Sequence, residues 1–208
     1  KIPDILFLKK PIDEESKKLL FGKDVNKYHS YFNNNWVNYK PEEMMKIELQ
    51  RNGGGLRLRN KLIFERNKIL TRQTADEIIA AYDIDNYYYS NTLHATTITD
   101  KNYSPFYVLA VLNSRLITWY YRRTTAETGK VFAQVKIEIL RQLPIKYLQN
   151  QKPFIEIVDK ILAITKSSDY LENPAKKEEV KEYEKQIDQM VYKLYALTPE
   201  EIAIVKGK

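Results

Sequence analysis

The residues with the clearest chemical potential are eight basic side chains in the segment 46–73, which contains only two acidic ones. Residues 1–143 carry 23 Lys and Arg against 16 Asp and Glu, whereas residues 144–208 carry 11 of each. A localised positive field attracts polyanions, and the planar arginine fork pairs with phosphate or with guanine edges. The pattern therefore indicates nucleic acid, with a solvated basic surface as the alternative. The eight are Lys46, Arg51, Arg57, Arg59, Lys61, Arg66, Lys68 and Arg72.

Spacing ranks these side chains as candidate contacts. Arg57 and Arg59 flank Leu58, so both lie on one side if the segment is extended. Arg72 and Gln73 form a donor-rich pair after an apolar run, where Arg can fork onto guanine and Gln onto adenine in a major groove; a solvated strand end is the alternative. A weaker basic patch surrounds a glycine turn further along. The predicted contacts are Lys46, Arg51, Arg57, Arg59, Lys61, Arg72, Gln73, Lys130, Gln134 and Lys136.

Catalytic chemistry has little support in this sequence. There is no cysteine, and the two histidines, His29 and His94, are far apart, so thiolate chemistry and a zinc site are not expected. The glycines at 53–55 predict a mobile loop tip, but they match neither G-x-x-x-x-G-K-[ST] nor G-x-G-x-x-G. The letters PD at 3–4 and ESK at 15–17 spell a nuclease motif, yet the second set lies in a polar run rather than in a buried strand. We expect no catalytic residue and no bound cofactor or metal in this chain.

Composition predicts a globular protein that does not enter a membrane. Hydrophobic residues make up 43% of the 208 positions and charged ones 29%, a balance that supports a packed core. No run approaches the eighteen or so apolar residues of a membrane span, and no signal peptide opens the chain, so we expect a cytoplasmic location. The start at Lys1, without Met, suggests a fragment of a longer polypeptide. Tyr87–Tyr89 could stack on bases, but in a strand they are better explained by packing.

The elements that must position these residues are mixed before Pro144. Thr74 and Glu77 satisfy a capping box that favours a helix at 76–81, in conflict with the β-branched composition there, which favours a strand. Ser104 with Pro105 begins a helix that breaks near Asn113 and Ser114. Strands are predicted at 68–72, 78–82 and 87–99.

After Pro144 the sequence predicts only helices. Apolar residues recur at helical spacing through 154–162, and Asn173–Pro174 supplies a cap and first turn for a second helix. Apolar positions from Val180 to Leu197 alternate steps of three and four, the seam of one helix packed on another. A Thr198-x-x-Glu201 box begins a short last helix. We therefore predict an α+β fold of short strands followed by a C-terminal helical part.

Several segments of this chain, taken in order, resemble segments of one known family, the TaqI-like C-terminal specificity domain. This family provides target recognition in type IIG restriction-modification enzymes and adenine-specific DNA methyltransferases. The segments are residues 22–28 (GKDVNKY), 36–39 (WVNY), 64–83 (FERNKILTRQTADEIIAAYD), 107–121 (YVLAVLNSRLITWYY), 134–145 (QVKIEILRQLPI) and 187–205 (IDQMVYKLYALTPEEIAIV).

This resemblance implies a DNA target-recognition domain at 1–145, a helical subdomain at 146–208, and double-stranded DNA as partner. It further implies methyltransferase and endonuclease domains in the same parent chain, which S-adenosylmethionine and magnesium would serve. DNA-reading side chains differ among members of such a family, so none is assigned by position. An RNA-binding module and a non-catalytic protein-interaction scaffold are the alternatives, since both can carry a basic surface.

Overall fold

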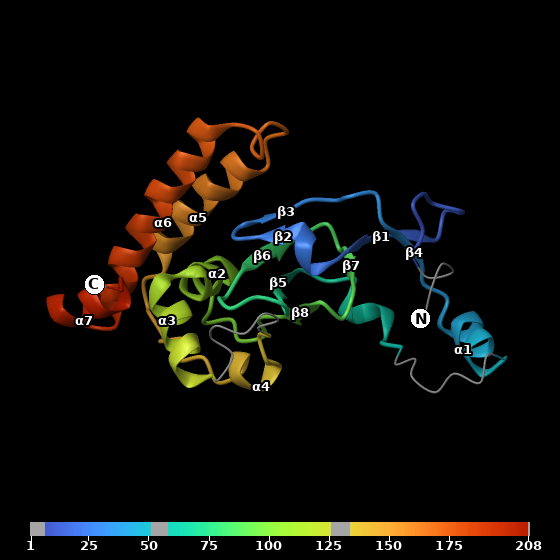
Figure 1. Ribbon diagram of the computed structural model, residues 1–208, viewed down its shortest axis with the longest axis horizontal. Helices are drawn as coiled ribbons and strands as arrows, with labels where there is room; N and C mark the ends of the chain where they lie inside the picture. The colour runs from blue at the N-terminus through green and yellow to red at the C-terminus, as the bar shows by residue number, and fades with distance from the viewer. Residues whose placement is uncertain (1–6, 51–57, 126–133, 208) are drawn as a thin grey trace.

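The protein has an α+β fold in the computed structural model, which describes residues 7–50, 58–125 and 134–207 (Figure 1). This confirms the predicted fold class. Strands are β1 (Ser16–Leu20), β2 (Val25–Asn26), β3 (His29–Ser30), β4 (Trp36–Asn38), β5 (Lys68–Arg72), β6 (Ala80–Asp83), β7 (Tyr88–Tyr89) and β8 (Leu93–Thr96). Helices are α1 (Pro41–Gln50), α2 (Pro105–Asn113), α3 (Arg115–Thr124), α4 (Ile137–Leu140), α5 (Lys152–Thr165), α6 (Pro174–Leu194) and α7 (Pro199–Val205), with 3-10 turns η1 (Gly22–Asp24) and η2 (Lys61–Ile63).

The strands form two small sheets and a hairpin. β1 pairs antiparallel with β4 and parallel with β7, and β2 pairs with β3. β5 is the central strand of the order β6-β5-β8 and is antiparallel to both neighbours, with Leu70 opposite Ala81 and Ala95. Burial of residues 68–71 explains why β5 is a continuous β-branched and apolar run after Lys68.

Side-chain caps fix where α2, α3, α6 and α7 begin, and those of α2, α6 and α7 were predicted. Ser104 accepts a hydrogen bond from the second residue of α2, and Ser114 both ends α2 and caps α3. Asn173 caps α6, and Thr198 and Glu201 form the reciprocal capping box of α7. Local sequence therefore sets the starts of α6 and α7, whereas α5 begins without a side-chain cap.

One strand overrides a local helix signal. The segment after Thr74 forms no helix at 76–81, and β6 begins at Ala80 instead. Asn113 and Tyr28 satisfy the backbone of Ala80 there: Asn113 Oδ1 accepts from the Ala80 amide at 2.9 Å, and the Ala80 carbonyl accepts from Asn113 Nδ2 and from the Tyr28 amide, each at 2.9 Å. A contact distant in sequence thus satisfies the backbone in extended form. Residues 16–18, which belong to the polar run noted in the sequence, form the start of β1, and Lys17 is exposed there.

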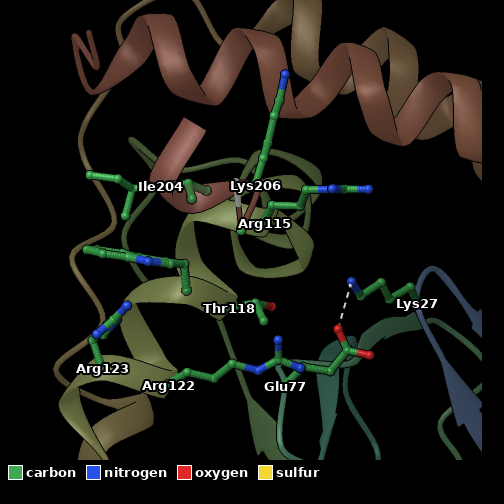
Figure 2. A pocket seen from close by; sticks show the side chains of 11 residues that line it. Lys27, Glu77, Arg115, Thr118, Arg122, Arg123, Ile204 and Lys206 are labelled. Carbon is green, nitrogen blue, oxygen red and sulfur yellow. Dashed lines mark ion pairs between the residues drawn. The ribbon is translucent and has the colours of Figure 1, made fainter. Parts of the chain in front are cut away.

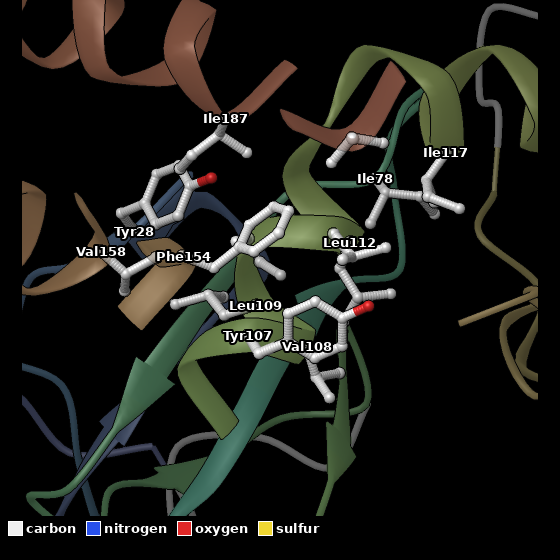
Figure 3. Packing of buried hydrophobic residues seen from close by; sticks show 14 of the residues in the cluster. Tyr28, Ile78, Tyr107, Val108, Leu109, Leu112, Ile117, Phe154, Val158 and Ile187 are labelled. Carbon is white, nitrogen blue, oxygen red and sulfur yellow. The ribbon is translucent and has the colours of Figure 1, made fainter. Parts of the chain in front are cut away.

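The main core lies where α2 meets α5, α6 and the sheet. Figure 3 shows Tyr28, Phe154 and Ile187, from three separate segments, in one cluster with Leu109 of α2. The rings of Tyr107 and Phe154 meet edge to face at 5.2 Å. Residues from both sides of the predicted domain boundary at 145–146 contribute to this buried cluster. The boundary itself stays a prediction. Within the described ranges, no helix has the length and apolarity that crossing a membrane requires.

Candidate nucleic-acid interface

A short, mostly exposed stretch, residues 59–66, carries three basic side chains, of which Arg59 and Lys61 are predicted contacts. We call it the basic segment. Arg59, Lys61 and Arg66 are exposed, and Asn60 caps the turn η2 by accepting from the Leu62 amide at 2.9 Å. Arg66 Nε donates to the Leu62 carbonyl at 2.6 Å, so its side chain follows the turn. The segment thus presents positive charge on a locally ordered backbone.

Tyr39 holds the first residue of the basic segment. Its hydroxyl accepts from the Arg59 amide at 2.7 Å and donates to the Arg59 carbonyl at 2.6 Å. Burial raises the pKa of Tyr39 above its ordinary value of 10.0, although the Arg59 backbone partly opposes the rise. The hydroxyl therefore keeps the proton that it donates throughout the neutral range.

Phe64 holds the other end through an aromatic cluster. It is 6% exposed and stacks on Tyr88 at 4.4 Å, with Tyr39 and Tyr89 against its edges. The Tyr88 hydroxyl donates to Glu65 Oε1 at 2.8 Å and so fixes the position of the one acidic side chain of the segment. Burial in this cluster confirms that Tyr88 packs in the core rather than stacking on bases.

A buried ion pair contacts the basic segment next to Phe64. Lys68 and Asp83 have fully buried side chains and form an ion pair. Lys68 Nζ also donates to the Phe64 carbonyl at 2.7 Å, while the Asp83 carboxylate accepts from the amides of Asp85 and Tyr87 at 2.9 and 3.1 Å. Burial lowers the pKa of Lys68 and raises that of Asp83, and the opposite charge of each partner works against both shifts. Lys68 is therefore a structural cation.

Arg72 is similarly occupied inside the protein. Its Nε donates to the Val25 carbonyl and its Nη2 to Asn26 Oδ1 at 2.9 Å, so the side chain joins β5 to β2. Burial lowers the pKa of Arg72 from its ordinary value. Its predicted role in DNA contact stays a prediction, but these bonds would have to break before the guanidinium could reach a base.

A second group of predicted contacts is assembled from distant parts of the sequence. The Gln73 carbonyl accepts from the Val135 amide at 2.6 Å, and Thr74 forms an isolated bridge with Gln134. Gln134 and Lys136 are exposed, and Gln73 is half-buried. We call Gln73, Gln134 and Lys136 the bridge group. The sequence separates its members by about sixty positions, so only the fold brings them together.

Besides Arg72, the structure describes one other predicted contact outside the basic segment and the bridge group, Lys46. Lys46 is exposed on α1, which Figure 1 places at one end of the long axis, away from α4 next to the bridge group. Arg51, Arg57, Lys130 and the glycines at 53–55 lie outside the described residues. The sequence did not predict that Tyr39 binds the backbone of Arg59, because no local pattern indicates a partner twenty residues away.

Comparison with known proteins adds a family. A family model for the TaqI-like C-terminal specificity domain matches residues 17–145, more than half of the chain. The match includes the basic segment and the bridge group and ends before α5. No curated protein matches the chain. Among the residues described, no three or more His, Asp or Glu side chains gather as metal ligands would.

Proposed function

Because the chain belongs to the TaqI-like C-terminal specificity domain family, we propose that it binds double-stranded DNA and selects the target of a larger restriction-modification enzyme. Specificity domains recognise and do not catalyse, so this part of the parent contributes selection alone. The observation that carries the proposal is the basic segment, in which Arg59 and Lys61 project from a backbone anchored at both ends.

Anchoring matters because a flexible segment loses conformational entropy when it is ordered by binding, and this loss lowers the affinity. A cation on a fixed backbone loses less freedom on meeting a phosphate, so more of the contact energy appears as affinity. Each phosphate neutralised contributes about −0.9 to the slope of log affinity against log salt concentration. Arg59, Lys61 and Arg66 would together account for a slope of about −2.7.

The bridge group suits the other part of recognition. Phosphate contacts set position, whereas amide and cationic side chains at base edges set sequence preference. Gln can pair with adenine and Lys with guanine, each good pair adding roughly 1–3 kcal/mol of discrimination. Gln134 and Lys136 are exposed on one short stretch, which supports their use as base readers.

The proposal extends to the parent protein. An adenine methyltransferase domain would receive a flipped adenine that this domain has placed, and an endonuclease domain would cut nearby. S-adenosylmethionine and magnesium would serve those domains, and the parent would work in the cytoplasm. What supports this extension is the family of enzymes in which such specificity domains occur.

Fluorescence anisotropy of the full chain tests the proposal. The probes are labelled duplexes with a randomised centre and single-stranded RNA of equal length, titrated between about 50 and 200 mM salt. We expect preference for duplex DNA and affinity that falls steeply with salt. Tighter binding to the RNA would favour an RNA-binding module, and an absence of salt-dependent affinity for either polymer would favour a protein scaffold.

A further inference from the structure

A second charged site lies beside α3, the helix whose Tyr121 hydroxyl also donates to the Gln134 carbonyl of the bridge group at 2.6 Å. It is a cavity of about 690 Å³ between α3, the end of α7 and the β2–β3 turn. Figure 2 shows Arg122 and Thr118 of α3 directed toward Glu77, which pairs with Lys27, while Arg115 lies nearer Lys206 and the Lys206 side chain extends away from Glu77. Nothing in the proposed DNA contact uses these residues.

Most of the lining comes from one face of α3 and from residues 204–207 at the end of α7. The lining residues of α3 recur at steps of three and four, which places them on a single side of the helix. Gly207 follows α7 with φ of 77°, a left-handed conformation that ends the helix and leaves Lys206 beside the cavity. The α3 residues are Arg115, Thr118, Trp119, Arg122 and Arg123.

Carboxylates hold three of the cations that line the cavity. Arg115 pairs with Asp188 at 3.3 Å. Arg122 pairs with Asp76 at 3.1 Å and Lys27 with Glu77 at 3.4 Å; of the three acids, only Glu77 lines the cavity. These pairs fix the directions of long side chains, which would otherwise lose rotamer freedom when a ligand binds.

The two remaining cations have aromatic partners instead. The Arg123 guanidinium lies 5.7 Å from the Trp119 ring centre, and Lys206 Nζ lies 5.8 Å from that of Tyr192. Neither forms an ion pair with a carboxylate in the part of the chain that the structure describes. Such contacts orient a cation without removing its charge, although Lys206 also lies near enough to Asp188 to oppose the rise that burial causes in the pKa of that carboxyl.

Two buried hydrogen-bonding groups in the lining also lack partners. Thr118 is 6% exposed, and its hydroxyl has no hydrogen bond within the described residues; Figure 2 shows this oxygen turned to the side of the cavity that Glu77 lines. The indole N–H of Trp119 is likewise buried without a partner there. Native proteins rarely leave such groups unsatisfied, so a hydrogen-bonding partner is expected for each of them.

The chemistry of the lining selects the ligand. Arginine and lysine only donate hydrogen bonds, so they require an acceptor-rich anion, and Glu77, the one acid in the lining, is paired with Lys27. Trp119, Ile204 and Val205 add an apolar side, and the volume falls within the range that holds small molecules but excludes a duplex. We propose that this cavity binds a small phosphorylated molecule of nucleotide size.

Complementing the helix dipole is the main competing explanation for these charges. It accounts for Arg122 and Arg123 in the last turn of α3. It does not account for Arg115, which lies at the first residue of the same helix, where a cation is disfavoured. Nor does it explain the unpartnered groups of Thr118 and Trp119.

Tryptophan fluorescence tests the proposal directly. The chain has two tryptophans, so Trp36→Phe leaves Trp119 as a reporter inside the cavity. ATP and sodium tripolyphosphate are the probes, and each should give a saturable change in emission. Arg123→Ala with Lys206→Ala should weaken ATP binding by at least roughly tenfold, since charged hydrogen bonds are lost. Both positions are exposed, so the fold should survive, as circular dichroism would verify.

A matched control separates a site from general charge. Lys166→Ala with Lys177→Ala removes the same charge from exposed positions outside the cavity and should leave ATP affinity unchanged. A lack of saturable response, or equal losses in the two double variants, would overturn the proposal. A response to duplex DNA but not to ATP or tripolyphosphate would also overturn it. Failure of duplex binding in the anisotropy assay would leave it untouched.

Discussion

Replacing Tyr39 by Phe should loosen the basic segment and weaken DNA binding without unfolding the protein. The change removes one hydroxyl that makes two hydrogen bonds, at 2.6 and 2.7 Å, to the backbone of Arg59. Each such bond contributes a net of about 0.5–1.5 kcal/mol, so local opening should become easier by about 1–3 kcal/mol. The ring stays in place against Phe64, which preserves the aromatic cluster.

Hydrogen exchange measures this opening at the atom concerned. The Arg59 amide should exchange about 5- to 150-fold faster in Tyr39→Phe, since roughly 1.4 kcal/mol corresponds to a factor of ten. The dissociation constant for duplex DNA should rise by up to the same factor, because binding must then order the segment. Tyr31→Phe is the control, as it removes a hydroxyl bond to the Lys23 carbonyl. Unchanged exchange at Arg59 would refute the anchoring role of Tyr39.

Two further predictions concern stability. Lys68→Met should cost about 3–5 kcal/mol in urea unfolding because Asp83 is left buried and unpaired, and adding Asp83→Asn should recover much of that loss; no recovery would contradict the ion-pair explanation. Burial lowers the pKa of His29 below its ordinary 6.5, so protonation favours the unfolded chain. Its stabilising contribution should therefore be complete above pH 6.5 and be lost as pH falls through 6.5 toward the folded pKa. His29→Gln should flatten that part of the curve of unfolding free energy against pH, and an unaltered curve would contradict the assignment.

Helix starts were predictable because their determinants are local. Ser104 with Pro105, Asn173 with Pro174 and Thr198 with Glu201 each satisfy backbone donors within a few residues. The helix α1 was not predicted, although Pro41 followed by two glutamates is a typical first turn. Its apolar positions are too few to give a clear period.

Contacts distant in sequence could not be predicted. The Thr74–Glu77 box favoured a helix, but Asn113 supplies hydrogen bonds that only the folded chain brings to Ala80. The donor-rich pair Arg72–Gln73 at the end of an apolar run suggested a DNA contact, whereas the bonds of Arg72 to β2 appear only in the structure. A sequence identifies cations but not which of them the fold has already used.

Salt titration of DNA affinity tests the central claim most directly. Arg59→Ala with Lys61→Ala should make the slope of log affinity against log salt shallower by about 1.8, or about 0.9 for each lost phosphate contact. Lys166→Ala with Lys177→Ala, which removes equal charge from the C-terminal helical part, should leave the slope unchanged. Equal slopes for the two double variants would contradict a DNA contact through the basic segment.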